Sequence, residues 1–215
     1  MICAVIFDLD NTLYDYDLCN EYAEKMLYEK IHKCFNMTVD QAAYALSESK
    51  KIVKKRLGNT AASHNRLLYM QTLCENAGKN SLIYAKEMYD CYWNEMLSKM
   101  HLYEYVIPLL IQLKDKQIKT AILTDLTAYI QYRKLEKLGL LQYIDFLVTS
   151  EEVGEEKPSA KMYDLVLKKI GCRPEEALMI GDDYEKDILG ARRMGMATIQ
   201  YMKDKNMIKE VAHLI

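Results

Sequence analysis

The segment from residue 2 to residue 12, which reads ICAVIFDLDNT, decides the fold that this sequence predicts. It joins a short apolar run, Ile2 to Phe7, to an acidic segment that begins at Asp8. An apolar run this short, rich in branched side chains and ended by a charge, is typical of a buried strand. Side chains two residues apart in an extended segment point to the same side, so we expect Asp8 and Asp10 to face one cavity at the end of that strand.

Four more apolar runs have strand character, and helical patterns separate them. The predicted strands are Lys119 to Leu123, Phe146 to Thr149, Leu178 to Ile180 and Ala197 to Tyr201. Apolar residues at helical spacing predict helices over 105–116, 128–138, 160–170 and 186–194. Strands that alternate with helices predict an α/β fold with a parallel sheet covered on both faces, in which ligands bind at the carboxyl ends of the strands.

The interval from Tyr14 to about Met100 differs from the rest of the sequence because it contains no strand pattern. Its apolar and aromatic residues recur at helical spacing and predict several amphipathic helices. We therefore expect a helical insertion over residues 14–100, inside a discontinuous α/β core formed by residues 1–13 and 101–215.

The composition excludes binding that is driven by bulk charge. The chain has 215 residues, 50% of them hydrophobic, so it is long enough to bury a large core. Its formal net charge of -2 creates no electrostatic field that would attract nucleic acid or anionic lipid. We expect neither a nucleic acid nor a membrane as partner. The N-terminal apolar run is too short for a signal peptide or a membrane span, and the six cysteines form no C-x-x-C pair, so we expect a cytoplasmic protein with reduced thiols.

The second and third groups of polar residues suit a phosphate. Thr124 ends the second predicted strand and precedes Asp125; its hydroxyl can donate to an anionic oxygen or cap the chain locally. Pro158 favours the first turn of the next helix and holds Lys157 extended, which places an ammonium beside a helix N-terminus. The alternative for Lys157 is a solvated lysine paired with Glu155 or Glu156.

The fourth group follows the strand Leu178 to Ile180 and contains Asp182, Asp183 and Asp187. Clustered carboxylates at a strand end suit a hard cation such as Mg²⁺, and Asp182 is the favoured ligand. The alternative is a polar loop in which Asp187 caps the following helix. One parallel sheet would bring all four groups together at its carboxyl edge.

The order of these four motifs resembles the haloacid dehalogenase-like hydrolase superfamily, and the resemblance covers the chain outside the helical insertion. It implies a Rossmann-like α/β core with an inserted helical cap that closes over the site. It also implies a Mg²⁺-dependent phosphatase that hydrolyses a small phosphorylated metabolite through an aspartyl-phosphate.

The resemblance also implies a role for each motif residue. Asp8 would be the nucleophile and Asp10 the acid and base. Thr124, Asp125 and Lys157 would surround the phosphoryl group. The Mg²⁺ would be held by Asp8, by the backbone carbonyl of Asp10 and by Asp182, with support from Thr12 and from Asp183 or Asp187.

Two positions depart from the family pattern, and other activities stay open. Asp125 stands where the family often has Asn, and Asp183 where it often has Ser. A phosphomutase similar to β-phosphoglucomutase is one alternative, although Thr12 favours hydrolysis. A 2-haloacid dehalogenase is a less favoured one, because that branch lacks the counterparts of Asp10 and Asp182. A third is an interaction protein that has kept the fold without catalysis.

The helical insertion offers one candidate substrate contact. The polar cluster Ser63 to Arg66 opens a helical run, so Asn65 and Arg66 are candidate contacts to the substrate, and the Arg66 guanidinium could bind a second anionic group. The alternative is a helix N-terminus with a solvated Arg66. We expect a monomer or a homodimer.

Overall fold

The protein is built around a five-stranded parallel sheet. The computed structural model describes residues 1–203 and 206–215. The strands lie in the order β3-β2-β1-β4-β5, and each neighbouring pair is parallel. Their bounds are β1 (Ala4–Phe7), β2 (Lys119–Thr124), β3 (Phe146–Thr149), β4 (Ala177–Gly181) and β5 (Ala197–Gln200). The predicted α/β fold is confirmed, with β1 two residues shorter at its start than expected.

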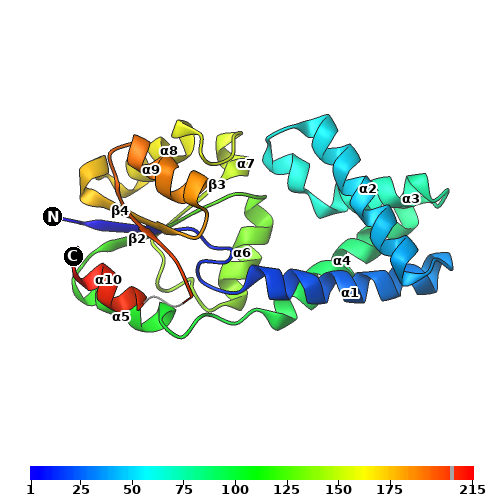
Figure 1. The fold of residues 1–215 in the computed structure, drawn as a ribbon, viewed down its shortest axis with the longest axis horizontal. Helices are drawn as coiled ribbons and strands as arrows, with labels where there is room; N and C mark the ends of the chain where they lie inside the picture. Colours follow the sequence, from blue (N-terminus) through cyan, green and yellow to red (C-terminus); the bar gives the residue numbers. More distant parts are fainter. Residues whose placement is uncertain (204–205) are drawn as a thin grey trace. The chain divides into compact units, whose positions relative to one another are not determined.

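Helices cover both faces of this sheet. Figure 1 shows α8 and α9 over one face and α5 and α10 over the other. The helices that follow β1 in this part of the chain are α5 (Val106–Asp115), α6 (Ala128–Lys137), α7 (Ser150–Val153), α8 (Ala160–Ile170), α9 (Gly190–Arg193) and α10 (Met207–Ala212), with a 3₁₀ turn η2 (Pro174–Glu176).

The predicted helix over 186–194 is wrong in its start and in its type. The chain forms a π-helical turn, η3 (Tyr184–Leu189), and only then the short helix α9. The side chain of Asp183 caps the turn by accepting hydrogen bonds from the backbone N–H groups of Glu185 and Lys186, both at 3.0 Å. This cap begins the helical segment two residues earlier than the apolar pattern indicated.

The centre of the sheet is buried on both faces. All four residues of β1 are fully buried because β2 and β4 flank it and helices cover it. Val166 on α8 packs in a cluster with Ile6, Leu123 and Met179 from the three central strands. Burial of this apolar surface fixes the register of the strands, and therefore fixes where each strand end lies.

The chain divides into two compact units, Met1–Asp15 with His101–Ile215, and Tyr16–Met100. Tyr14 and Asp15 belong to the first unit, although the sequence placed the start of the insertion at Tyr14. Tyr14 forms a β-bridge with Leu102, and its hydroxyl donates to Asp10, so it is tied to the sheet unit.

The second unit is helical. It consists of α1 (Tyr16–Phe35), α2 (Val39–Leu57), the 3₁₀ turn η1 (Ala61–His64), α3 (Arg66–Asn76) and α4 (Ser81–Lys99). Thr38, Asn65 and Asn80 cap α2, α3 and α4 with their side-chain oxygens. Its core contains the buried side chains of Tyr92 and Trp93 on α4. None of the helices described in either unit is long and apolar enough to cross a membrane.

Candidate active site

The three central strands bring the first, second and fourth motifs to one edge of the sheet. Phe7 pairs with Ile122 of β2 and Ile180 of β4, so the residues that follow in each strand lie side by side. Asp8 comes directly after β1, and its backbone N–H donates to the carbonyl of Ile180 at 2.8 Å. Thr124 is the last residue of β2. The gathering of motifs at the carboxyl edge, predicted from the strand ends, is therefore present.

Lys157 joins this group from the loop between α7 and α8. Its ammonium lies 2.6 Å from Asp8 Oδ1 and 2.7 Å from Asp187 Oδ1, and the residue is only 4% exposed. The alternative of a solvated Lys157 is therefore wrong. Glu155 instead pairs with Lys161, while α8 begins at Ala160, two residues beyond Pro158. The expected place of Pro158 in the first helical turn is also wrong, because Ser159 occupies the cap position.

The charges in this cluster shift each other's pKa. Burial lowers the pKa of Lys157, but the carboxylates of Asp187 and Asp8 outweigh it, and the pKa of Lys157 lies well above its ordinary value. Burial raises the pKa of Asp8, with Lys157 opposing the rise and Asp187 and Asp10 adding to it. Burial likewise raises the pKa of Asp187. One buried ammonium therefore does not compensate the carboxylates around it.

Thr12 and Asp182 complete the acidic side of the cluster. Thr12 Oγ1 donates to Asp8 Oδ2 at 3.1 Å and lies 3.4 Å from Asp182 Oδ1. Burial, together with the charge of Asp8, raises the pKa of Asp182 to about 6. Asp8, Asp182 and Asp187 each offer a carboxylate oxygen within 4.8 Å of the others. An oxygen-only donor set with excess negative charge suits a hard divalent cation.

Asp187, and not Asp183, lies in this cluster. Asp187 Oδ2 accepts the backbone N–H of Asp183 at 3.1 Å, and the residue is 1% exposed. A Cβ atom on Gly181 would lie 2.2 Å from Asp187 Oδ2, so the close approach of this carboxylate requires glycine at position 181. Asp183 is exposed, and its carboxylate caps η3. The alternative in which Asp187 caps the helix is therefore wrong.

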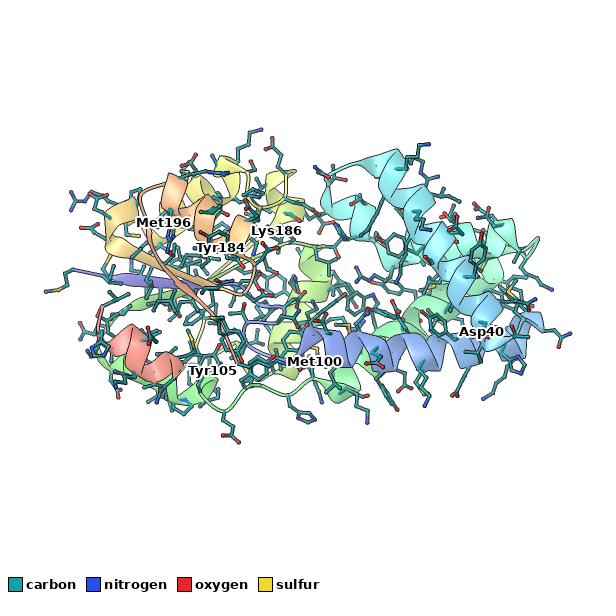
Figure 2. All side chains as sticks on the ribbon, in the orientation of Figure 1. Asp40, Met100, Tyr105, Tyr184, Lys186 and Met196 are labelled. Carbon is teal, nitrogen blue, oxygen red and sulfur yellow. The ribbon has the colours of Figure 1, made fainter. Side chains whose placement is uncertain are left out.

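Asp125 uses both of its carboxylate oxygens. Oδ1 accepts the backbone N–H of Lys157 at 3.0 Å, and Oδ2 lies 2.8 Å from the ammonium of Lys186. Lys186 and its neighbour Tyr184, both labelled in Figure 2, lie on the segment after β4. Asp125 thus ties the second motif to the third and fourth, and its charge is balanced by Lys186.

Thr124 is held by a residue that the sequence analysis did not single out. Gln131 Nε2 donates to Thr124 Oγ1 at 2.8 Å and to the Asp125 carbonyl at 2.7 Å. Thr124 Oγ1 itself donates to the same carbonyl at 3.2 Å. Gln131 therefore holds both the Thr124 hydroxyl and the adjoining carbonyl in place at the end of β2.

Asp10 has two partners that the sequence analysis also missed. Lys134 Nζ lies 2.7 Å from both Asp10 Oδ1 and Oδ2, and Tyr14 donates its hydroxyl to Oδ1 at 2.6 Å. Gln131 and Lys134 both lie on α6 and are fully buried. A signal for them exists in the sequence: they interrupt the apolar positions of this segment, which are Ile130 and Leu135 on α6 and Leu138 directly after it.

In the helical unit, Asn65 and Arg66 make contacts of their own. Asn65 Oδ1 accepts the backbone N–H of Leu67 at 2.9 Å and so caps α3. The Arg66 guanidinium donates to the hydroxyl of Tyr16 at 2.6 Å and to the carbonyl of His64 at 2.8 Å, and it lies 5.5 Å from the ring centre of Trp93. A substrate contact by either residue stays a prediction.

Comparison with known proteins identifies the family. Residues 5–201 match the family described as haloacid dehalogenase-like hydrolase. A ribulose-1,5-bisphosphate 5-phosphatase from Halopiger xanaduensis is 38% identical over 203 residues, which cover 94% of this chain and 85% of the relative. A glyceraldehyde 3-phosphate phosphatase from Methanopyrus kandleri is 32% identical over 205 residues, which cover 95% of this chain and 86% of the relative.

Solved structures show the same fold. A phosphatase of this family from Thermococcus onnurineus superposes with a TM-score of 0.74 at 24% identity, covering 100% of this chain and 97% of the other. A 2-haloacid dehalogenase from Pseudomonas syringae superposes with a TM-score of 0.80 at 21% identity, covering 100% and 98%. The resemblance read from the motifs is confirmed along nearly the whole sequence: this chain belongs to the haloacid dehalogenase-like hydrolases.

Proposed function

We propose that this hydrolase cleaves the phosphate monoester of a small phosphorylated metabolite through an aspartyl-phosphate on Asp8. The observation that carries the proposal is the position of the Lys157 ammonium, 2.6 Å from Asp8 Oδ1, at the carboxyl edge of the sheet. A buried cation beside a carboxylate can draw a phosphoryl group to that carboxylate and balance its charge. The phosphatases among the relatives support the same activity.

In the first step, Asp8 attacks phosphorus while the bond from phosphorus to the leaving oxygen breaks. The leaving oxygen takes a proton from Asp10, which is the second carboxyl group on the same segment. Lys157 and the hydroxyl of Thr124 stabilise charge on the phosphoryl oxygens. The products of this step are the free alcohol, the aspartyl-phosphate and an ionised Asp10.

In the second step, Asp10 accepts a proton from a water molecule that attacks the same phosphorus. The bond from phosphorus to Asp8 breaks, inorganic phosphate leaves and Asp10 is again protonated. Dividing the displacement between two steps gives each a lower barrier than the direct attack of water on the ester.

We also propose Mg²⁺ as the cofactor. The donor set fits, because three buried or half-buried carboxylates, from Asp8, Asp182 and Asp187, face one another within 4.8 Å. Asp8, Asp182 and the backbone carbonyl of Asp10 would hold the ion, with Asp187 in support. When bound, Mg²⁺ supplies positive charge that offsets the phosphoryl oxygens and keeps Asp8 ionised.

For the substrate we propose a sugar phosphate. The relatives with 38% and 32% identity are named for ribulose 1,5-bisphosphate and glyceraldehyde 3-phosphate, while a pyrimidine 5'-nucleotidase from Streptococcus pneumoniae is 29% identical over 205 residues. We propose that the helical unit is the cap of the family and that it sets this preference.

The test is phosphate release from p-nitrophenyl phosphate and from a panel of sugar phosphates and nucleoside monophosphates, with Mg²⁺. We expect Asp8→Asn to abolish release and Asp115→Asn, a matched change at an exposed position on α5, to leave it intact. Acid-quenched mass spectrometry should show one phosphoryl group on Asp8 in the wild type. Equal rates for wild type and Asp8→Asn would falsify the aspartyl-phosphate.

Two further assays separate the alternatives. Interconversion of β-glucose 1-phosphate and glucose 6-phosphate without net phosphate release would mean a phosphomutase. Chloride release from 2-chloropropionate without Mg²⁺ would mean a dehalogenase. Failure to act on any of these compounds would favour an interaction protein that has kept the fold without catalysis.

A further inference from the structure

The most unusual group outside the motifs is the buried ammonium of Lys134. It is completely excluded from solvent, and its Nζ lies 2.7 Å from both carboxylate oxygens of Asp10, on a segment more than 120 residues away along the chain. Lysine is almost never fully buried unless it is paired, because removing an ammonium from water is costly. Its position therefore depends on Asp10.

The two ends of this ion pair differ in exposure. The Lys134 side chain is 0% exposed, whereas the Asp10 side chain is 28% exposed. The partly open carboxyl group is free to meet a substrate or water, while the lysine approaches it from the protein interior. Tyr14, whose hydroxyl donates to Asp10 Oδ1 at 2.6 Å, is fully buried as well. The Asp10 carboxyl group therefore contacts two buried side chains on one side and is accessible to solvent on the other.

A purely structural role does not explain this arrangement. An apolar side chain at position 134 would continue the buried stripe of α6, and replacing a buried ion pair with packed apolar groups often leaves stability unchanged or raises it. Ile130 and Leu135 lie on the same buried face of the helix and provide apolar neighbours for such a side chain. A lysine at this place is explained if the orientation of Asp10 has to be fixed.

We infer that Lys134 is a positioning residue for the proposed acid and base, and that it acts by holding the carboxyl group of Asp10 in one orientation. The inference rests on the proposed function and names a further residue for it. A protonated carboxyl keeps an acceptor oxygen, so the ammonium retains a contact with Asp10 in both steps. Holding the carboxyl group of Asp10 within reach of the reacting oxygen contributes to the rate, because a small displacement of a catalytic group slows the reaction strongly.

The test uses two substrates whose leaving groups differ. The p-nitrophenolate ion leaves without a proton, whereas the alkoxide of a sugar phosphate such as glyceraldehyde 3-phosphate needs one from Asp10. With Lys134→Met we expect kcat on the sugar phosphate to fall about 100-fold, with KM changed little. On p-nitrophenyl phosphate we expect a burst of one equivalent of p-nitrophenol at the wild-type rate, then slow turnover. With this substrate the first step needs no proton from Asp10, and only hydrolysis of the aspartyl-phosphate uses Asp10.

A double-mutant cycle and a matched control complete the experiment. If Lys134 acts through Asp10, Lys134→Met has no further effect in an Asp10→Asn background. Lys137→Met, an exposed lysine on the same helix, should behave as wild type. Thermal melting of each variant checks folding. Lys134→Arg, which keeps the charge, should regain part of the steady-state rate and serves as the second variant if Lys134→Met does not fold.

Several results would overturn the inference. They are wild-type rates for Lys134→Met, equal slowing of both phases on both substrates, and an additive effect with Asp10→Asn. A wild-type protein that is no faster than Asp8→Asn on either substrate overturns the proposed function itself, and the inference with it. The two failures are therefore distinguishable.

Discussion

The ammonium of Lys186 lies 2.8 Å from Asp125 Oδ2 and joins the segment after β4 to the loop after β2. Asp125 is one of the two positions that depart from the pattern of the family, and it adds a negative charge beside the place proposed for the phosphoryl group. Lys186 balances this charge. The burial of Lys186 lowers its pKa, but Asp125 outweighs this and the pKa of Lys186 is raised.

The first prediction concerns this ion pair. Lys186→Met leaves the Asp125 carboxylate without its counter-ion, so we expect KM for a phosphate monoester to rise about fivefold with little change in kcat. The effect corresponds to about 1 kcal/mol because both partners are partly exposed. Steady-state kinetics at constant ionic strength measure it.

The double variant Asp125→Asn with Lys186→Met removes both charges and should return KM to near the wild-type value. Lys161→Met, which removes an exposed lysine paired with Glu155, is the matched control. A double variant no better than Lys186→Met alone would show that repulsion by Asp125 is not the cause.

The second prediction concerns Gln131. Its amide donates to Thr124 Oγ1 and to the Asp125 carbonyl, and so orients the hydroxyl group proposed to contact the phosphoryl group. In Gln131→Leu the Thr124 hydroxyl loses the hydrogen bond that orients it, so we expect KM to rise about tenfold, which corresponds to the loss of one hydrogen bond. Gln112→Leu on α5 is the control. An unchanged KM for the phosphate monoester, measured by the release of inorganic phosphate, would contradict this role of Gln131.

The strand ends and the motif residues on them could be predicted from the sequence because both depend on local rules. A short apolar run ends at a charge, and parallel strands share one carboxyl edge, so Asp8, Thr124 and Asp182 are found from strand boundaries alone. The residue type of Lys157 and its proline neighbour predict its place at the site, whereas its burial between Asp8 and Asp187 follows from long-range packing.

The partners of these residues could not be predicted in the same way. Lys134 reaches Asp10 from a helix whose rotation about its axis depends on packing against the sheet. Whether Asp183 or Asp187 joins the site depends on the turn type of η3. The apolar pattern predicts an α-helix there, whereas the segment forms a π-helical turn. A polar residue in an apolar helical stripe is the signal that would have identified Gln131 and Lys134.

The third prediction concerns Gly181, the last residue of β4. A methyl group there would lie 2.2 Å from Asp187 Oδ2, so Gly181→Ala must displace a carboxylate that contacts Lys157. We expect the free energy of unfolding to fall by about 1–3 kcal/mol and kcat/KM to fall with it. Urea denaturation and kinetics measure the two effects. Gly154→Ala, in open space with φ 81°, carries only the backbone cost and should leave kcat/KM unchanged. An equal loss of kcat/KM in Gly154→Ala would contradict the steric argument.

The last prediction concerns Mg²⁺ and pH. Burial raises the pKa of Asp8, Asp182 and Asp187, and that of Asp182 reaches about 6 from an ordinary 3.8. These carboxyl groups bind protons more tightly in the folded than in the unfolded chain. Their contribution to stability is therefore fully present below about pH 4, and it is lost as the pH rises through about 6 for Asp182 and about 7 for Asp8.

A divalent cation replaces those protons, so its stabilising effect should grow over the same pH range. We expect Mg²⁺ relative to EDTA to raise Tm by about 5 °C at pH 7 and by much less at pH 4.5. Comparing the two samples at each pH cancels groups outside the cluster, such as Glu176, whose pKa the Arg173 side chain lowers to about 2. Asp182→Asn should reduce the gain at pH 7, whereas Asp115→Asn should not. An equal gain at both pH values, or none, would show that the cation does not bind these carboxylates.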